Sequence, residues 1–470
     1  MAIIISFLLF LLFFVVIGVL SSLKNKHTTD DYLLAGQNVK PWLVALSAVA
    51  TNNSGYMFIG MIGYTYTMGI SSVWMMIGWV LGDLLASGFI HKRLRIASAR
   101  ENVLSFSSVL SNWHGTDFKW LRLLGGLITI GFLGAYAAAQ LNAGSKALHV
   151  LFGWDYSLGA IIGAAMVLLY CFSGGIRASI WTDAAQSFVM IFAMGLLLYK
   201  SVDITGGFSA FVQALNSVSP SFLSIVPSGL QIAGSIGLGL FIAGWVFAGF
   251  GVVGQPHIMV RFMTMDNPNN MGRVRFWYYL WYISFYILTI GTGLAARVLL
   301  PEASSFDAEL AMPTLAQQIL PEALVGLILA GLFAATMSTA DSQILSCTAS
   351  ITNDFPIIEN NASYLLTKFS TVFVTVTALA IALSGNDSVF SLVMIAWSAL
   401  ASGFAPLLTV YALGGKVSEK TGILMMLSGI IAMLAWRQLG LSETMYEAAP
   451  GIVAGFLPFF LSMIFKKRLA

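Results

Sequence analysis

The sequence predicts an all-α membrane protein of about thirteen transmembrane helices, built as one domain with an inverted internal repeat. Three observations support this fold class. The 470 residues are 58% hydrophobic and only 9% charged, whereas charged residues make up about 25% of an average soluble domain. Apolar runs long enough to cross a bilayer follow one another along the chain. Two of these runs are interrupted at matching places, as in transporters with repeated halves.

An α-helix needs about 20 mostly apolar residues to cross a bilayer, and this length places the spans. We predict them at 2–22, 42–67, 71–93, 121–149, 158–176, 179–200, 229–253, 276–298, 324–350, 365–384, 388–412, 421–437 and 449–465. They divide the domain 1–470 into a leading helix at 2–22, a first repeat at 42–200, a second repeat at 229–412 and two C-terminal helices at 421–465. Each repeat has an odd number of spans, so the second enters the membrane from the opposite side.

The distribution of basic residues orients these spans. Cytoplasmic loops of membrane proteins are enriched in Lys and Arg. With the N-terminus outside, most of the 23 Lys and Arg residues fall in cytoplasmic loops, and all of them, Arg261 included, fall in loops or at span ends. We therefore expect an external N-terminus and a cytoplasmic C-terminus. The small net charge of +3 and the lack of a basic patch argue against nucleic acid as a partner.

Two spans contain residues that disfavour a continuous helix. The second holds Ala50-Thr51-Asn52-Asn53-Ser54-Gly55, a cluster that favours turns and side-chain hydrogen bonds. The seventh holds Gly249-Phe250-Gly251-Val252-Val253-Gly254-Gln255-Pro256, in which glycine and proline weaken the helix. Unwound backbone at membrane depth persists only where it lines a cavity. The paired breaks therefore predict a solute and ion site near the middle of the membrane.

Hydroxyl-bearing residues share one face of the ninth span. Ala335, Ser338, Thr339 and Ser342 stand at i, i+3, i+4 and i+7. Sodium is a small hard cation that prefers oxygen ligands, and this face together with carbonyls of an unwound neighbour would supply them. The alternative is that these serines and threonines pack helices and bond to their own carbonyls.

Three acidic residues fall inside predicted spans, namely Asp83, Asp183 and Asp341. Charges at membrane depth are costly and are functional candidates by default. We expect Asp183 and Asp341 at similar depth, where they repel each other unless a cation or a shared proton lies between them. They predict a cation path without choosing between sodium and protons. For Asp83 we expect a structural role, as a brace of an inner gate.

Short motifs lie in order along nearly the whole chain. They are Asp31-Tyr32-Leu33-Leu34-Ala35-Gly36, Ala45-Leu46-Ser47-Ala48, Trp181-Thr182-Asp183-Ala184-Ala185-Gln186, Gly254-Gln255-Pro256-His257, Arg261-Phe262-Met263, Met337-Ser338-Thr339-Ala340-Asp341-Ser342, and Ala396-Trp397 with Pro406. Through them the chain resembles the sodium:solute symporter family, in particular its bacterial sodium/proline branch. The resemblance implies a LeuT-type 5+5 inverted repeat, with one extra N-terminal helix and two C-terminal helices, in the bacterial cytoplasmic (inner) membrane.

The resemblance also implies where sodium binds. The site common to the family corresponds to backbone oxygens of Ala50 and Asn53, the carbonyl of Ala335 and the hydroxyls of Ser338 and Thr339. A second, deeper site found in some members corresponds to Asp183, Ser338, Asp341 and Ser342. Some relatives carry serine at the position of Asp341, so this acid either adds a ligand or holds a proton.

For the solute, the resemblance implies a site between the two broken helices and the third core-facing helix. The corresponding positions are Asn52, Ser54, Gly55, Tyr136, Gln140, Ala248, Val252 and Pro256. Proline transporters carry an acid at the position of Asn52, and Trp and Tyr at the positions of Ala248 and Val252. This difference predicts a larger, reshaped pocket unless Trp245 compensates.

Together these features predict a sodium-coupled symporter that imports a small organic solute by alternating access, working as a monomer in the lipid bilayer. A proline-like amino acid is the first choice of solute, with pantothenate, a monocarboxylate or a polyol as alternatives. A proton-coupled symporter and a transporter-like solute sensor are the alternative functions. The five histidines show no HExxH spacing, and no nucleophile with a paired base is apparent, so we do not expect an enzyme.

Overall fold

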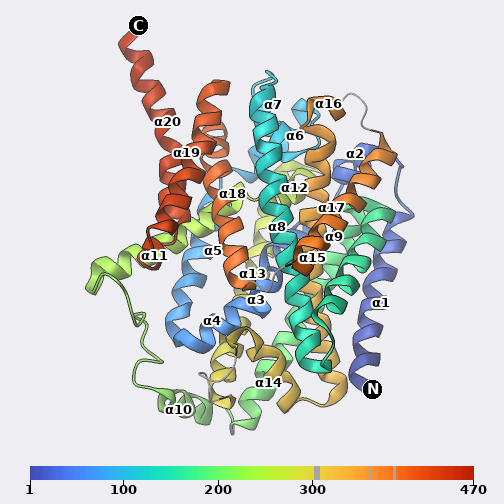
Figure 1. Ribbon diagram of the computed structural model, residues 1–470, viewed down its shortest axis with the longest axis vertical. Helices are drawn as coiled ribbons and strands as arrows, with labels where there is room; N and C mark the ends of the chain where they lie inside the picture. The colour runs from blue at the N-terminus through green and yellow to red at the C-terminus, as the bar shows by residue number, and fades with distance from the viewer. Residues whose placement is uncertain (301–306, 360–362, 385–387, 470) are drawn as a thin grey trace.

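The chain forms a bundle of long helices (Figure 1). The computed structural model describes residues 1–300, 307–359, 363–384 and 388–469. Within these ranges the regular structure is helical apart from an isolated bridge between Val39 and Met265. Ten helices among the described residues are long and apolar enough to cross a membrane. The all-α membrane fold is confirmed, and the number of thirteen crossings stays a prediction.

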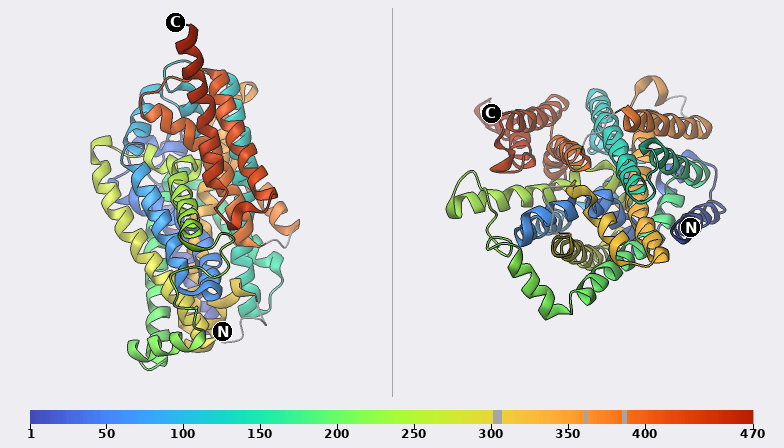
Figure 2. Two further views of the ribbon diagram at one scale, coloured as in Figure 1. Left: turned by 90° about the vertical axis from the view of Figure 1, so that its left-hand side faces the viewer. Right: turned by 60° about the horizontal axis from the view of Figure 1, so that its bottom comes forward.

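The two termini lie at opposite ends of the bundle (Figures 1 and 2). We call the end at which α1 (Ala2–Ser22) begins the N-terminal face. The opposite end, where α20 (Ala448–Leu469) finishes, is the C-terminal face. An odd number of crossings requires this arrangement, because a chain that crosses a bilayer an even number of times returns to the side on which it started.

After α1, the first half of the chain continues with a short helix, α2, on the C-terminal face. Their bounds are α2 Thr29–Leu34, α3 Pro41–Phe58, α4 Gly60–Met68, α5 Val73–Ser87, α6 His91–Glu101, α7 Phe106–Asn112, α8 Lys119–Phe152, α9 Tyr156–Ile204 and α10 Phe208–Val218. The predicted span 71–93 is too long, since α5 ends at Ser87 and His91 already opens α6, a basic helix whose composition is typical of a loop region.

Helix α9 covers two predicted spans, 158–176 and 179–200. Its 49 residues would extend roughly 74 Å at 1.5 Å per residue, more than twice the hydrocarbon thickness of a bilayer. Gly175 divides the helix with φ +56° and ψ −141°. A Cβ atom at this glycine would lie 2.3 Å from the carbonyl oxygen of Tyr32, so both the backbone conformation and the space require glycine.

The second half contains the other broken span. The bounds are α11 Gly234–Phe250, η3 Gly251–Gly254, α12 Pro256–Met263, α13 Met271–Leu299, α14 Ala311–Ile319, α15 Glu322–Asn353, α16 Pro356–Glu359, α17 Tyr364–Ser384, α18 Val389–Ala412 and α19 Glu419–Gln438. The predicted span 229–253 is displaced, because the helix starts only at Gly234 and continues beyond the break to Met263. Pro256 begins α12 rather than ending a helix, as its fixed φ allows.

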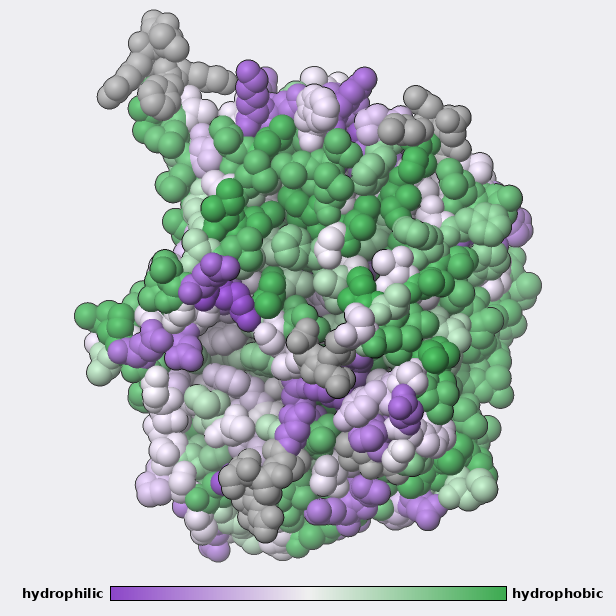
Figure 3. Space-filling model, in the orientation of Figure 1, coloured by the Kyte–Doolittle hydropathy of each residue, from purple (hydrophilic) through white to green (hydrophobic). Residues whose placement is uncertain are grey.

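Apolar side chains cover much of the outer surface, as expected where lipid is the solvent. On the face in Figure 3 hydrophobic residues form a broad band, and hydrophilic residues gather at the upper edge and in the lower part. On α1, Leu9 is 62% exposed and Phe13 47%. These exposed apolar residues agree with the composition, because a soluble surface would not expose so many of them.

A buried carboxylate ties three elements together near the N-terminal face. Glu309 accepts hydrogen bonds from Lys146 Nζ on α8 (2.6 Å), from Ser388 Oγ (2.7 Å) and from the N–H of Phe390 at the start of α18 (3.0 Å). Burial by itself raises the pKa of Glu309, but these donors outweigh it and hold the pKa below its ordinary value of 4.5. The carboxylate therefore stabilises the folded protein in its ionised form.

We expect Glu309→Gln to lower the free energy of unfolding by about 1–3 kcal/mol at neutral pH, because it removes the ionised partner closest to Lys146. A depressed carboxyl pKa contributes stability that is present above the unfolded pKa and is lost as the pH falls through the folded pKa. The variant and the native protein should therefore converge in thermal unfolding as the pH falls below about 4.5. Asp307→Asn is the matched control, since Asp307 is 49% exposed and lies 3.8 Å from the same ammonium.

Candidate functional site

The first helix break lies in the second span, within the predicted cluster. Ser54 has φ 40° and ψ 174°, outside the helical region. The backbone N–H of Gly55 donates to Gln140 Oε1 on α8 (2.8 Å), and the N–H of Tyr56 donates to Ser54 Oγ (3.1 Å). Side chains thus satisfy donors that the helix releases, which keeps the unwound segment stable at membrane depth. The structure confirms this predicted break.

The second break separates α11 from α12, again where it was predicted. Gln255 adopts an extended conformation with φ −97° and ψ 100°, and its Nε2 donates to the carbonyl of Trp397 on α18 (3.0 Å). Trp397 Nε1 donates in turn to the carbonyl of Ala248 (2.9 Å). Helix α18 therefore supports both sides of the break.

The predicted sodium-site residues of α3 and α15 meet at a junction of oxygen atoms. Ser338 Oγ lies 3.2 Å from the carbonyl oxygen of Ala50 and 3.1 Å from that of Ala335. Thr339 Oγ1 lies 2.9 Å from the carbonyl oxygen of Thr51 and 3.2 Å from that of Ala335. All five residues are buried. The oxygen atoms of this α3–α15 junction belong to hydroxyl and carbonyl groups, which are neutral. Such oxygen atoms are the ligands that suit a small hard cation such as sodium.

For Asn53, whose backbone oxygen was predicted as a sodium ligand, the structure shows only a side-chain bond, so that role stays a prediction. Asn53 Nδ2 donates to the carbonyl of Val49 on its own helix (2.9 Å), and the carbonyl that faces Thr339 is that of Thr51. The sequence analysis did not select Thr51 as a sodium ligand, although Thr51 belongs to the turn-forming cluster that runs from Ala50 to Gly55. Its Oγ1 also lies 3.0 Å from Ser342 Oγ.

The two acids of the predicted deeper site are brought together around an arginine. Arg261 Nη2 lies 3.3 Å from Asp183 Oδ2 and 3.4 Å from Asp341 Oδ1, and it also donates to the hydroxyls of Ser179 and Ser342. The three charged side chains are 0% exposed. We call these five residues the acid–arginine cluster.

Other hydroxyls add hydrogen bonds to the two acids, although Asp183 Oδ1 has no partner among the described residues. Ser47 Oγ donates to Asp183 Oδ2 (2.6 Å), and Tyr170 donates to Asp341 Oδ2 (2.8 Å). The expectation that a cation lies between the acids is met by a side chain of the protein itself. Burial in the core contradicts the prediction that every basic residue, Arg261 included, lies in a loop or at a span end. Arg261 belongs to α12, the second half of the broken seventh span, which continues past the break to Met263 and packs against α3 and α15.

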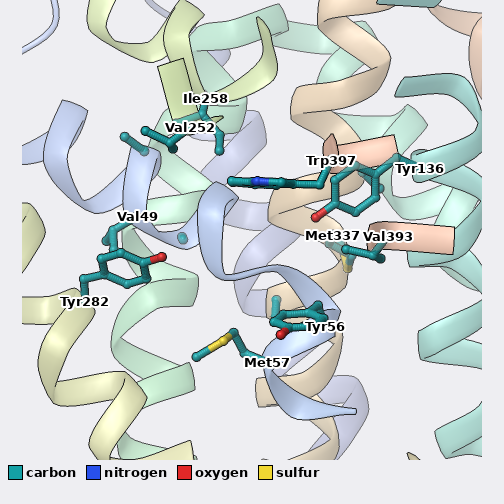
Figure 4. Close-up of a cluster of buried hydrophobic side chains, with 14 of the residues drawn as sticks. Val49, Tyr56, Met57, Tyr136, Val252, Ile258, Tyr282, Met337, Val393 and Trp397 are labelled. Atoms are coloured by element: carbon teal, nitrogen blue, oxygen red, sulfur yellow. The ribbon is translucent and has the colours of Figure 1, made fainter. Parts of the chain in front are cut away.

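Aromatic side chains surround the predicted solute site. Figure 4 shows Trp397, Tyr136 and Tyr56 around the break in α3, with Val252 nearby. Tyr136 donates a long bond to Ser54 Oγ (3.5 Å), and its ring lies 5.6 Å from that of His257, next to Pro256. The predicted solute residues from α3, α8 and the second break are thus gathered in one buried region.

Tryptophans fill the space beside Ala248, where the sequence predicted a larger pocket. Trp397 bonds to the Ala248 carbonyl and lies 5.0 Å, between ring centroids, from Trp79. Trp245, the residue expected to compensate, stacks on Trp79 at 6.0 Å and on Tyr446 at 5.1 Å. Aromatic groups from α5, α11 and α18 therefore stack beside Ala248; the sequence indicated Trp245 as a compensating residue but not that Trp79 and Trp397 lie there.

Asp83 links the solute region to two helices. Its carboxylate accepts hydrogen bonds from Tyr278 (2.8 Å) and Tyr279 (3.0 Å) on α13. Tyr278 accepts in turn from Asn52 Nδ2 (2.6 Å), and the hydroxyl oxygen of Tyr279 lies 2.8 Å from Ser87 Oγ. The carboxylate of Asp83 therefore links α5 to α13, as a structural brace would. Tyr278 also connects this carboxylate to Asn52.

This network gives a paired test. We expect Tyr278→Phe to raise the solute KM about 5- to 10-fold, because Asn52 loses the hydroxyl that orients its amide, a bond of about 1 kcal/mol. Tyr279→Phe is the matched control, since it also removes one bond to Asp83 but has no contact with Asn52. The measurement is solute uptake against solute concentration at saturating sodium. An equal rise in KM for both variants would contradict a specific role of Tyr278.

A membrane protein with two paired helix breaks, and an oxygen-lined junction beside one of them, has the architecture of an ion-coupled secondary transporter. The family model described as the sodium:solute symporter family matches residues 32–431. The chain belongs to this family.

Curated relatives match nearly the full length of the chain. A sodium/proline symporter of Salmonella typhimurium is 29% identical over 96% of this chain and 91% of its own. The high-affinity proline transporter PutP of Bacillus subtilis is 28% identical over 94% of each chain. A sodium/proline symporter of Haemophilus influenzae is 30% identical over 95% of this chain and 91% of its own.

Solved structures share the fold. A sodium-coupled sialic acid symporter in a substrate-bound outward-open state matches with a TM-score of 0.82 at 19% identity, covering 98% of each chain. Mhp1, a nucleobase-cation-symport-1 family transporter, matches with a TM-score of 0.56 at 16% identity over 92% of this chain and 94% of its own. The predicted LeuT-type fold is confirmed. The protein is a sodium-coupled symporter of a small solute.

Proposed function

We propose that this protein imports a small zwitterionic amino acid of the proline type together with sodium, by alternating access across a bacterial cytoplasmic membrane. The observation that carries the proposal is the α3–α15 junction, where Ser338 and Thr339 face the carbonyls of Ala50, Thr51 and Ala335. A cation bound there holds the broken α3 against α15, so the ion and the shape of the solute site depend on each other. Such coupling is reciprocal, and each ligand raises the affinity for the other.

The solute region carries groups that suit an amino acid. Among the described residues, Asn52 Oδ1 and Gln140 Nε2 are buried without a hydrogen-bond partner. The first is an acceptor for an amine, and the second is a donor for a carboxylate. The half-helices α4 and α12 also begin near the breaks, and helix N-termini favour anionic groups. The proline transporters among the relatives support the same solute class.

The solute would reach this region from the N-terminal face. A cavity of about 430 Å³ is lined by residues of α4, α11, α18 and the α19–α20 connection, including Tyr64, Trp245, Phe390 and Tyr446. Trp245 belongs both to this cavity and to the tryptophan group beside Ala248. In this proposal the aromatic side chains separate the entry cavity from the solute site.

We propose that the N-terminal face is external and the C-terminal face cytoplasmic. Helix α6 carries Lys92, Arg93, Arg95 and Arg100, and the positive-inside rule puts such a cluster in the cytoplasm. The proposed domain organisation is the predicted one, with repeats at 42–200 and 229–412 in a protein that functions as a monomer. The start of α3 lies beside the end of α12, where Val39 pairs with Met265, so the two broken spans run in opposite directions, which supports an inverted repeat.

Uptake into proteoliposomes tests the function. We expect radiolabelled proline to accumulate when an inward sodium gradient is imposed, and not with potassium in its place. Competition by unlabelled amino acids, pantothenate, monocarboxylates and polyols ranks the solute classes. Sodium-dependent uptake of another solute without proline transport would overturn the solute assignment alone. Equal uptake in sodium and potassium would overturn the coupling.

A further inference from the structure

One corner of the C-terminal face is built from three outer elements of the bundle. Helix α9 packs against both α1 and α17, and these helices lie on the right-hand side of Figure 1. The connection from α1 to α2 ties them together, because Asn25 Nδ2 donates to the carbonyl of Ser173 on α9 (3.4 Å) and to the hydroxyl of Tyr364 on α17 (3.3 Å). We call this region the Tyr364 corner, and its members are Lys24, Asn25, His27, Phe172, Ser173, Trp181, Tyr364 and Lys368.

Aromatic rings hold two lysine ammonium groups in this corner. Lys368 Nζ lies 4.0 Å from the ring centroid of Phe172 and 5.4 Å from that of Tyr364. Lys24 Nζ lies 5.7 Å from the ring centroid of Trp181. An aromatic face attracts a cation but uses none of its charge-assisted hydrogen bonds. Both ammonium groups are therefore still able to bind an anion.

Acids of the protein do not balance these two positive charges. Within the described part of the chain, neither Lys24 nor Lys368 forms an ion pair, whereas the neighbouring Arg177 pairs with Asp31. Residues 24–31 contain one further lysine and one further aspartate, whose formal charges cancel. The corner thus has an excess of two positive charges, which favours an anionic partner.

The sides of the corner are apolar and open to lipid. The exposed side chains are Leu20 and Leu23 of α1, Leu169 of α9, and Leu365 and Phe369 of α17. Free phosphate would use the ammonium groups and none of these side chains. A phospholipid uses both, because its acyl chains lie along apolar helix surfaces while its phosphate lies at the level of the interfacial Lys, Trp and Tyr residues.

We propose that the Tyr364 corner binds one phospholipid with a net negative head group. Lys24 and Lys368 hold the phosphate oxygens, and the acyl chains lie against α1, α9 and α17. With the C-terminal face in the cytoplasm, as proposed, this lipid belongs to the cytoplasmic leaflet. The lipid site shares no residue with the ion junction or the solute region, so it does not depend on which solute is carried.

Native mass spectrometry of the purified protein tests the lipid class. The protein in detergent is titrated with phosphatidylglycerol, and separately with phosphatidylcholine that carries the same acyl chains. We expect one phosphatidylglycerol to bind about 10- to 30-fold more tightly than phosphatidylcholine, since a lysine near a membrane surface contributes about fivefold in affinity for an anionic lipid. This preference should shrink as the ammonium acetate concentration rises. Equal affinity for the two lipids would overturn the proposal.

Inorganic phosphate separates a lipid site from a simple anion site. We expect millimolar phosphate to leave the bound phosphatidylglycerol in place, because phosphate gains nothing from the apolar side chains of the corner. Displacement of the lipid by phosphate at such a concentration would show that the corner recognises the anion alone, and the proposal would be wrong.

Variants assign the binding to the two lysines. Lys24→Gln combined with Lys368→Gln should weaken phosphatidylglycerol binding about 25-fold and leave phosphatidylcholine binding unchanged. Lys416→Gln combined with Lys420→Gln is the matched control, because it removes the same charge from two exposed lysines between α18 and α19. An equal loss of affinity in the control would mean that the lipid responds to the net charge of the protein and not to the Tyr364 corner.

A charge-retaining variant keeps the test decisive. Lys24→Arg combined with Lys368→Arg should bind phosphatidylglycerol within about threefold of the native protein. Loss of binding in this variant would contradict the role given to positive charge. If the glutamine variant fails to fold, as judged by thermal unfolding in detergent, the lipid preference of the native protein and the arginine variant carry the test.

Discussion

Replacing Ser338 or Thr339 with alanine should raise the sodium concentration for half-maximal uptake about 10- to 100-fold, with the maximal rate less affected. Each hydroxyl is one of the few oxygens at the α3–α15 junction, and a bond between a charged and a neutral group contributes about 1.5–3 kcal/mol. The measurement is solute uptake against sodium concentration at fixed solute.

Two further variants make this prediction specific. Thr339→Ser keeps the hydroxyl and should retain most of the sodium affinity. Ser346→Ala is the matched control on α15, because Ser346 Oγ is buried two turns beyond Ser338 with no partner among the described residues. If Ser346→Ala weakened sodium dependence as much as Ser338→Ala, the effect would reflect helix packing and not ligation.

Replacing Gly55 with alanine should lower uptake about 10- to 100-fold. The added Cβ would lie 2.5 Å from Thr336 Cγ2 and 3.1 Å from Gln140 Oε1, so the unwound segment must move away from both α15 and α8. Overpacking of this kind costs about 1–3 kcal/mol, and here it falls on the segment that joins the ion junction to the solute site. The measurement is initial uptake normalised to the amount of folded protein.

A second substitution can relieve the clash. Thr336→Ser removes Cγ2 but keeps the hydroxyl that donates to the Phe333 carbonyl (3.0 Å), so the double variant should recover part of the lost uptake. Gly131→Ala is the control, since nothing lies within 4 Å of the Cβ it would add. Absence of recovery would mean that Gly55 is needed for a reason other than its distance from Thr336.

Features that depend on local chemistry were predictable from the sequence. The break at Ser54 follows from a run of residues that form turns, and the break before Pro256 follows from glycine and proline. The hydroxyl-bearing face of α15 follows from helical spacing alone. The family resemblance then added which of these residues bind sodium, an assignment that remains a prediction.

Features that depend on which helices meet were not predictable. Arg261 was assigned to a loop because charge and position along the chain suggest one, yet it is fully buried. Its burial depends on the packing of α12 against other helices and on two acids that lie about 80 residues away in each direction along the chain. Trp397 likewise fills the space beside Ala248 from a distant helix.

By itself, the sequence determined the membrane fold, the two breaks and the oxygen-bearing face, because hydrophobic length, turn preference and helical period act within one segment. Only the tertiary structure decided that Thr51 faces Thr339, that tryptophans from three helices line the solute region, and that an arginine separates Asp183 from Asp341. These contacts join segments remote along the chain, and their energy comes from pairing buried charges and filling space, which no single segment specifies.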